Sequence, residues 1–541
     1  MNPRRLACAL SVLVILALLV GGTDAPAQPT QAPAPAGTGK YGGVFKAAHA
    51  AAPPTLDAMT SMAGATVWAT HSTLETLVAY DEQFKIARLL AEKWDVSPDG
   101  KSYTFHLRKG VKFHNGKEMT AEDVIASTKR FMEVNPRKGQ FSLLQSYTAK
   151  DRYTVIYTLS APSGSFLDAM AYPVAQMVVM PKELIEGKKA GELKVGEIIG
   201  TGPYRLVEAK LDQIIRLKRF EDYKPLPGER SGLAGAKIPY FDEIQILTVP
   251  EVGSRVAGIE TGTYDWAEGI PSTEYDRLKA NAGVRPYFKV PLDWSIYILF
   301  NHANKFSGDV KFRQAVLAAL DLDAVSLAIV GGRKEFYRLN PSLWVPEGPW
   351  AIADNPVAKQ QYHQKNPDKA KQLLKEAGYK GEEIVMVTNR DYDWMYKMIL
   401  AVADQLKKNV GMNVKVEVLD WPAQRAKWEE RTGWHMSTTG YLSQIIFAPD
   451  ALSSFWHSKS TSSERGFYAN PEMDRAFEAA AKGLTFEQRK EAFKRVETLF
   501  YQDLPNIKVT EIFGIEAIRS DIKGHTPWYR GSRFWGVWRD R

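Results

Sequence analysis

The sequence predicts an α/β protein, with α+β as the alternative arrangement, on three observations. Short apolar strands are expected at residues 244–249, 296–300, 383–387 and 414–419, and well-punctuated helices lie between them. No fixed internal repeat is visible, which argues against a solenoid. The length of 541 residues suits about two to four domain-sized units.

The first 27 residues have the three parts of a secretory signal. Arg4 and Arg5 form a basic start, residues 10–20 are aliphatic, and Ala25-Pro26-Ala27 supplies small residues for cleavage. The apolar run is shorter than the about 20 residues of a membrane-spanning helix. We therefore expect residues 1–27 to be a cleaved signal peptide and the mature protein to work in the periplasm.

The only cysteine, Cys8, lies before most of the apolar run. A lipid-modified cysteine would lie after that run, so lipid anchoring is disfavoured, and Arg4-Arg5 leaves twin-arginine export as a minor alternative. Once the signal is removed, no cysteine remains for a disulfide, a thiolate metal site or a nucleophile.

The formal net charge is +8, and the basic residues are scattered along the chain. This pattern does not favour nucleic acid as a partner. The 14 Trp and 23 Tyr indicate either a large core or a surface that stacks on a ligand.

Residues 28–41 are rich in Pro, Ala and Gly and read as a flexible linker, and the first strand follows at residues 43–48. Residues 94–109 read as a hairpin around a Ser-Pro-Asp-Gly turn, and Thr120 is placed to cap a helix.

Later helices have clear start and stop residues. One is expected over residues 309–330, where Gly331-Gly332 follow; Asn-Pro pairs open two others at residues 366 and 470, which stop near Gly378 and Gly483.

Motifs of common enzymes are absent from the sequence. There is no Gly-x-Ser-x-Gly elbow and no His-Glu-x-x-His segment. His106 and His114 could approach one another, but a metal ion needs further ligands. We therefore expect no catalytic residues, no metal and no cofactor, although sequence alone does not rule out a carboxylate pair.

One long segment carries a family resemblance. Residues 89–116 read LLAEKWDVSPDGKSYTFHLRKGVKFHNG, which closely resembles the signature of the family 5 extracellular solute-binding proteins. These are the dipeptide, oligopeptide and nickel-type binding components of ABC importers. The likeness runs from about residue 42 to the C-terminus, and further segments that resemble the family are 120–124, 200–204, 300–301, 310–321 and 366–379.

The resemblance implies a periplasmic binding protein-like fold of the cluster C type. Such a fold has two lobes joined by a two-strand hinge, with an extra subdomain in lobe I. On this basis lobe I is expected at residues 42–288, with its subdomain at about 76–199; lobe II at 289–507; and a return to lobe I at 508–541.

The implied function is capture of a small solute, which could be peptide-like, acidic or sugar-like, between two closing lobes. A monomer would then deliver the solute to an ABC permease in the inner membrane. The alternatives are a secreted hydrolase such as a glycosidase, a receptor-docking protein, and a metal-chelate or haem-binding protein on the same fold.

The resemblance also implies residues that bind the two charged ends of a peptide. Arg390 follows a strand in a setting similar to the one that holds the carboxylate-binding Arg of dipeptide-binding members; the alternative is a solvated Arg, or one paired with Asp391 or Asp393. After Tyr441, Gln444 stands where the family has an ammonium-binding Asp, and Asp450 is the alternative. A neutral amide at this position predicts poor binding of free α-amino peptides.

Several large side chains are expected to line the space between the lobes. The alternative for each is ordinary core packing. The candidates are Trp294, Tyr297, Trp421, Trp344, Tyr441, Met62 and Trp68.

Overall fold

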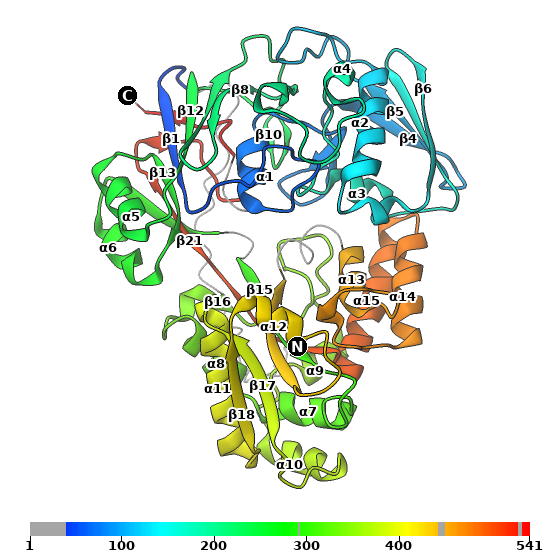
Figure 1. The fold of residues 1–541 in the computed structure, drawn as a ribbon, viewed down its shortest axis with the longest axis vertical. Helices are drawn as coiled ribbons and strands as arrows, with labels where there is room; N and C mark the ends of the chain where they lie inside the picture. Colours follow the sequence, from blue (N-terminus) through cyan, green and yellow to red (C-terminus); the bar gives the residue numbers. More distant parts are fainter. Residues whose placement is uncertain (1–38, 290–292, 442–448, 529–532, 541) are drawn as a thin grey trace, which may run out of the picture.

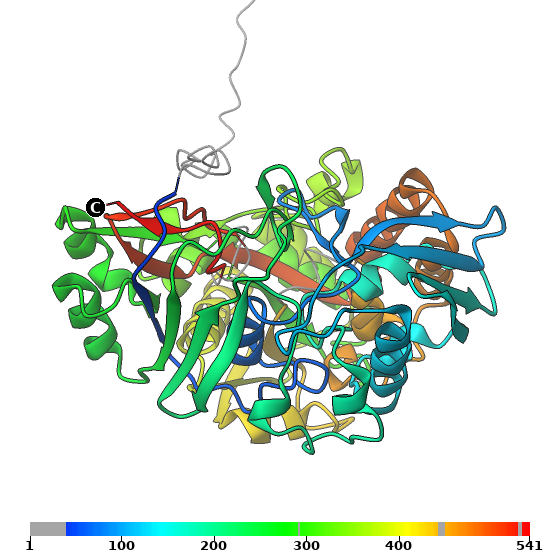
Figure 2. The same ribbon diagram turned by 90° about the horizontal axis from the view of Figure 1, so that it is seen from above.

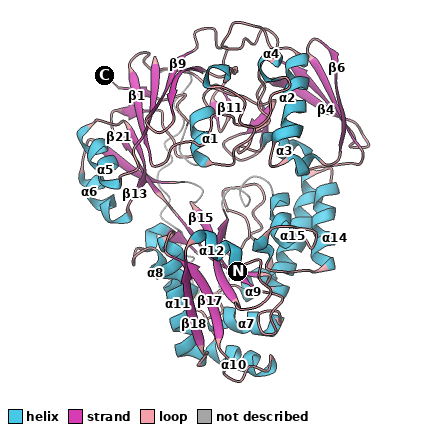
Figure 3. Cartoon of the chain, viewed as in Figure 1, coloured by secondary structure: helices cyan, strands magenta, loops and turns pink. Residues whose placement is uncertain are grey.

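The two largest sheets of the described residues each organise one half of the protein, as the computed structural model shows (Figures 1 and 3). The structure describes residues 39–289, 293–441, 449–528 and 533–540. The predicted signal peptide and most of the predicted linker lie outside these residues. We refer to the half built on the seven-stranded sheet as lobe I and to the half built on the six-stranded sheet as lobe II.

The sheet of lobe I combines strands from both ends of the chain, since β1 near the N-terminus pairs in parallel with β12 and β13. In spatial order its strands are β14 (Val284–Phe288), β21 (Ile515–Arg519), β13 (Trp266–Ile270), β1 (Val44–His49), β12 (Glu243–Thr248), β9 (Ile214–Arg219) and β8 (Tyr204–Lys210). The helices beside it are α1 (Gly64–Thr70), α5 (Val252–Thr261) and α6 (Tyr275–Ala280) (Figure 1).

A second sheet, of four antiparallel strands, lies at one side of lobe I, and we call it, with its helices, the four-stranded unit. Its strands are β4 (Ala91–Val96), β5 (Ser102–Leu107), β7 (Thr154–Leu159) and β6 (Leu144–Asp151). Its helices are α2 (Ala121–Val134), α3 (Phe166–Ala171) and α4 (Lys182–Ile185). The β4–β5 hairpin turns at Gly100, whose φ of 68° suits a residue without a side chain.

Local sequence explains the start of α2. The Asp123 carboxylate accepts hydrogen bonds from the backbone N–H and the hydroxyl of Thr120, so the predicted cap is present. The unit falls within the segment 76–199 that the resemblance marks as a subdomain.

Lobe II has strands β16 (Tyr337–Arg338), β20 (Asn506–Ile512), β15 (Trp294–Phe300), β19 (Met436–Tyr441), β17 (Ile384–Asn389) and β18 (Val414–Leu419), in that spatial order. Its helices are α7 (Val310–Ala319), α8 (Leu322–Ile329), α9 (Pro356–Gln361), α10 (Pro367–Glu376), α11 (Asp393–Val410), α12 (Trp421–Lys427), α13 (Ser453–Trp456), α14 (Pro471–Lys482) and α15 (Phe486–Asp503). Asn366 and Asn470 cap α10 and α14.

The single helix expected over residues 309–330 is two helices, α7 and α8. The break comes at Asp321, whose side chain accepts hydrogen bonds from the backbone N–H groups of Asp323 and Ala324. A carboxylate in this position caps a new helix, and the apolar periodicity on both sides hides the interruption.

The chain passes from lobe I to lobe II between β14 and β15, and returns between β20 and β21. The two passages are hydrogen-bonded to each other, because the N–H of Lys289 donates to Gly514 and the N–H of Asp293 donates to Ile512. The expected return at residues 507–508 falls inside β20. Since β20 pairs with β15 as far as Ile512, the chain leaves this sheet later than expected.

Within the described ranges, none of the helices has both the length and the apolar character required to cross a bilayer.

Candidate ligand-binding site

The carboxyl ends of parallel strands from both sheets face each other across the middle of the molecule (Figure 1). In lobe II, β15 begins directly after the first passage, and antiparallel β19 therefore ends beside that passage, with Ser295 opposite Tyr441. Because β17 and β18 run parallel to β19, their carboxyl ends lie at the same edge. In lobe I, β1, β12 and β13 end at the edge from which β14 leads into lobe II.

Ligands of open α/β sheets bind outside the carboxyl ends of the strands. We therefore expect the site residues to lie at the two facing edges.

Four rings, which we call the aromatic group, gather at the edge of lobe II: Trp294, Tyr392, Trp394 and Trp421. The Trp294 ring lies 5.8 Å from that of Trp394 and 6.3 Å from that of Tyr392. Tyr392 in turn lies 5.3 Å from Trp421. All four side chains are partly exposed, as is usual where rings provide a surface for stacking.

Two of these rings, Trp294 and Trp421, were predicted as lining residues, whereas Tyr392 and Trp394 were missed. The available signal was a pair of aromatic residues within four positions of Arg390, just after a strand. Gly440, at the end of β19, makes room for the group, since a Cβ there would lie 3.0 Å from Trp394 and 3.1 Å from Trp294.

Arg390 lies one residue after β17, next to the aromatic group, and is exposed. Its guanidinium donates to the Tyr396 hydroxyl at 2.9 Å and lies 4.5 Å from the centre of that ring. The two acids considered as its partners are engaged elsewhere: Asp391 accepts from the backbone N–H of Trp421, and Asp393 pairs with Lys397. In the described part of the chain, no carboxylate forms an ion pair with Arg390.

Three other predicted lining residues lie in the core of lobe II. Tyr297 and Tyr441 pack against each other with ring centres 4.6 Å apart, and Trp344 packs on Phe493. None of the three exposes more than 1% of its surface. Their side chains therefore fill the interior behind the edge, and the structure does not bring them together with the aromatic group.

The structure describes only one of the two candidates for ammonium binding. Gln444 lies outside the described residues. Asp450 forms an ion pair with Arg489 at 2.5 Å, and burial raises the pKa of its carboxyl. Its charge is thus already balanced by a residue of its own lobe.

Lobe I contributes a ring pair at its own edge. Trp68 of α1 stacks on His49 at the end of β1, with ring centres 4.7 Å apart. Met62, in the loop before α1, is 48% exposed. His49 also lies 3.5 Å from Glu268 of β13. Burial raises the pKa of Glu268, but His49 and Lys289 more than offset this effect, so its pKa lies below the ordinary value.

A second acid of lobe I, Glu516 at the start of β21, was not predicted as a site residue. It is fully buried and accepts a hydrogen bond from the Tyr287 hydroxyl at 2.7 Å. Burial raises the pKa of Glu516 to about 7, although Lys289 favours the charged form.

A pH-dependent stability follows from Glu516. The pKa of Glu516 is higher in the folded protein than in the unfolded chain, so between the two pKa values only the folded protein keeps the proton. The free energy of unfolding is therefore highest at low pH, and this stability is lost as the pH rises through about 7. We expect Glu516→Gln to remove up to about 3 kcal/mol of this pH dependence between pH 4.5 and 8. Chemical denaturation at both pH values measures it. Glu229→Gln, the same change at an exposed position, should keep the wild-type slope, and an unchanged slope in Glu516→Gln would refute the assignment.

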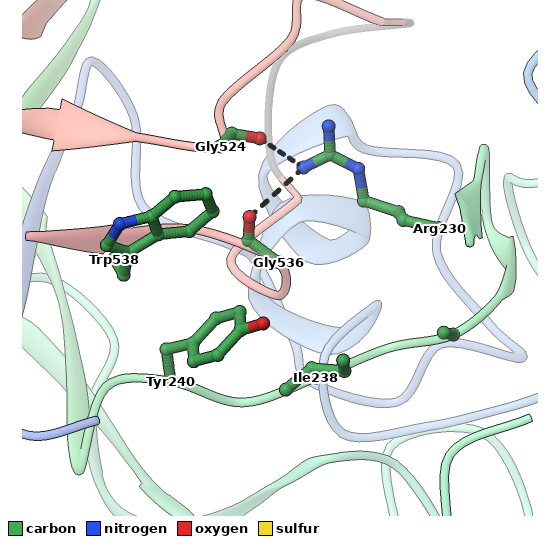
Figure 4. Close-up of a pocket in the computed structure, with 7 residues that line it drawn as sticks. Arg230, Ile238, Tyr240, Gly524, Gly536 and Trp538 are labelled. Atoms are coloured by element: carbon green, nitrogen blue, oxygen red, sulfur yellow. Dashed lines mark hydrogen bonds between the residues drawn. The ribbon is translucent and has the colours of Figure 1, made fainter. Parts of the chain in front are cut away.

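A small pocket lies elsewhere on lobe I (Figure 4). Its lining residues include Arg230, Tyr240 and Trp538. The Arg230 guanidinium donates to the carbonyls of Gly524 and Gly536, as Figure 4 shows. Burial and the nearby Arg533 lower the pKa of Arg230 to about 9. Since its donors bind the C-terminal segment, this Arg holds the fold together at this point.

No set of three or more His, Cys, Asp or Glu side chains among the described residues is arranged to hold a metal ion. The edges offer rings, an exposed guanidinium and buried carboxylates, which are groups that bind and orient a solute.

Comparisons with known proteins show which proteins the chain is similar to. A sequence model of the bacterial extracellular solute-binding proteins, family 5 Middle, matches residues 85–463. The chain is similar to the oligopeptide-binding protein AppA of Bacillus subtilis, with 26% identity over 526 residues that cover 91% of this chain and 90% of AppA. It is also similar to the glutathione-binding protein GsiB of Pectobacterium atrosepticum, with 28% identity over 441 residues that cover 79% of this chain and 81% of GsiB.

Among solved structures, the periplasmic binding protein DppA from Helicobacter pylori, in complex with the peptide STSA, is similar with a TM-score of 0.73. The identity is 23%, and the match covers 93% of this chain and 99% of DppA. The two-lobed α/β fold is thus shared with periplasmic binding proteins. The family match includes all four residues of the aromatic group.

Proposed function

The chain belongs to the bacterial extracellular solute-binding proteins of family 5, and on this premise we propose that it captures a small solute between its two lobes and delivers it to an ABC permease. Members of this family bind solutes for ABC importers outside the cytoplasm and are not enzymes. The secreted hydrolase considered from the sequence is therefore set aside. We propose that the chain captures its solute as a monomer.

The proposal rests on the two strand edges that face each other. One edge presents the aromatic group and Arg390, and the other presents Trp68 beside His49. A solute between them would be stacked from both sides and shielded from water when the lobes close on the two passages.

Arg390 supports a solute with an anionic group. A guanidinium presents parallel donors that match the two oxygens of a carboxylate, and this one has no ion-pair partner in the described part of the chain. The aromatic group supports an apolar or ring-bearing part next to the anion. A peptide-like solute fits both, and the two relatives described above are named for binding an oligopeptide and glutathione.

The amine end of the solute is proposed to be bound weakly or not at all. Gln444 would provide no charge, and Asp450 is paired with Arg489. We therefore propose a peptide-like or acidic solute whose α-amino group is blocked or not required.

Two measurements test the proposal. Mass spectrometry of the small molecule that co-purifies should identify an anionic solute. Isothermal titration should then show tighter binding of N-acetylated dipeptides than of the same dipeptides with a free α-amino group. A co-purified cationic solute, or micromolar binding of ordinary free dipeptides with no preference for the acetylated forms, would overturn it.

A further inference from the structure

The two lobes touch at a second place, away from the passages that connect them. Helices α14 and α15 of lobe II lie next to the four-stranded unit of lobe I in both views of the fold (Figures 1 and 2). The backbones meet directly, because the N–H of Gly164 donates to the carbonyl of Ala481 at 3.0 Å. A Cβ on Gly164 would lie only 1.7 Å from the carbonyl oxygen of Gly483, so this contact tolerates no larger residue.

A buried charge crosses the same contact. Arg489 of α15 forms an ion pair with Asp168 of α3 at 2.5 Å and donates to the carbonyl of Gly164 at 2.9 Å. Its other terminal nitrogen pairs with Asp450 at 2.5 Å. One guanidinium from lobe II is therefore shared between a carboxylate of its own lobe and a carboxylate of lobe I.

The surroundings hold these groups in place. Arg489 and Asp168 are each 5% exposed. The Tyr80 hydroxyl donates to the second oxygen of Asp168 at 2.9 Å, and the guanidinium lies 4.8 Å from the centre of the Trp350 ring. Burial opposes the charge on Arg489, but Asp168 and Asp450 raise its pKa above the ordinary value, so it stays a cation.

We propose that the Asp168–Arg489 ion pair and the Gly164–Gly483 contact form an interlobe latch, which favours the observed arrangement of the lobes before any solute binds. Close charge pairs at protein interfaces couple strongly when their hydrogen bonds are complete. The latch lies on the opposite side of the molecule from the passages (Figure 1), so it adds a second restraint on lobe movement. Under the proposed function, in which the lobes close on a solute, the latch would also set the fraction of molecules ready to bind. This inference does not depend on the identity of the solute.

Distance measurement in the solute-free protein tests the latch. The mature chain expected from the sequence has no cysteine, so spin labels can be attached at Lys129→Cys in α2 and Arg475→Cys in α14, both exposed positions on opposite sides of the contact. The protein is unfolded and refolded first, to remove any co-purified solute. Double electron–electron resonance then gives the distance distribution between the lobes.

Two variants should open the latch by different routes. Asp168→Asn removes the charge that crosses the contact, and Gly164→Ala inserts a methyl group without changing charge. We expect each to shift the distribution to longer distances, with roughly a tenfold fall in the ratio of closed to open molecules.

Two matched controls should leave the distribution unchanged. Asp450→Asn removes a carboxylate from the same guanidinium, but within lobe II. Gly139→Ala changes a glycine of the same four-stranded unit, where an added Cβ meets no atom within 4 Å.

Folded Asp168→Asn and Gly164→Ala proteins with wild-type distances would overturn the proposal. An equal shift in Asp450→Asn would also overturn it, because Arg489 would then act through its ion pair inside lobe II. If Asp168→Asn does not fold, Gly164→Ala alone decides, with circular dichroism as the check on folding.

Discussion

Replacing Glu511 with glutamine is expected to lower the unfolding temperature of lobe II by on the order of 10 °C. Glu511 of β20 has no exposed surface and pairs with Lys508 at 2.7 Å and with Arg338 at 2.6 Å. Burial raises the pKa of Glu511, but these two cations more than offset the effect, so its pKa lies below the ordinary value. Without the carboxylate, the buried Lys508 ammonium would lose the ion pair that balances its charge, which costs about 3–5 kcal/mol.

Glu347→Gln is the matched control, because Glu347 pairs with the same Arg338 from a position with 41% of its side chain exposed. Exposed ion pairs contribute about 0–1 kcal/mol, so this variant should unfold close to the wild-type temperature. Differential scanning calorimetry of both variants makes the comparison. Equal transitions in wild type and Glu511→Gln would show that the network adds no stability.

Replacing Arg390 with glutamine is expected to weaken binding of the co-purified solute by about 10–100-fold, since hydrogen bonds to charged groups contribute about 1.5–3 kcal/mol. The expectation rests on the proposed anionic solute and on the exposed guanidinium beside the aromatic group. Isothermal titration of both proteins with that solute measures the ratio of dissociation constants.

Arg495→Gln serves as the control for this variant. Arg495 of α15 is about half exposed and pairs with Glu472, at a distance from the facing edges in the fold. Its loss removes the same charge from lobe II but should leave the affinity unchanged. Equal affinities of the Arg390→Gln and wild-type proteins would show that Arg390 does not contact the solute.

The secondary structure could be predicted well where the signal is local. The hairpin at residues 94–109, the cap at Thr120 and the Asn caps of α10 and α14 depend on residues next to one another in the chain, and all are present. The break between α7 and α8 was missed because Asp321 interrupts the helix without interrupting the apolar pattern.

The candidate site was predicted less completely, for a different physical reason. Trp294, Trp421 and Arg390 follow or precede strands, and strand ends of one sheet meet at one edge, so position in sequence was informative for them. Trp344, Tyr297 and Tyr441 have the same residue types in similar settings, yet they are buried. Aromatic composition does not distinguish a ring that fills the core from one that faces a solute, because both environments favour large apolar surfaces.

The alternation of helices and strands, the family and the function class could be predicted from the sequence alone, because motifs and hydrophobic periods are read from neighbouring residues. Which side chains meet depends on the tertiary structure. Asp450, a candidate for binding an amine, turned out to balance Arg489, and Arg489 reaches Asp168, a residue 321 positions away in the chain. Contacts at such separation depend on how the sheets and helices pack in three dimensions, and no local pattern of residues encodes them.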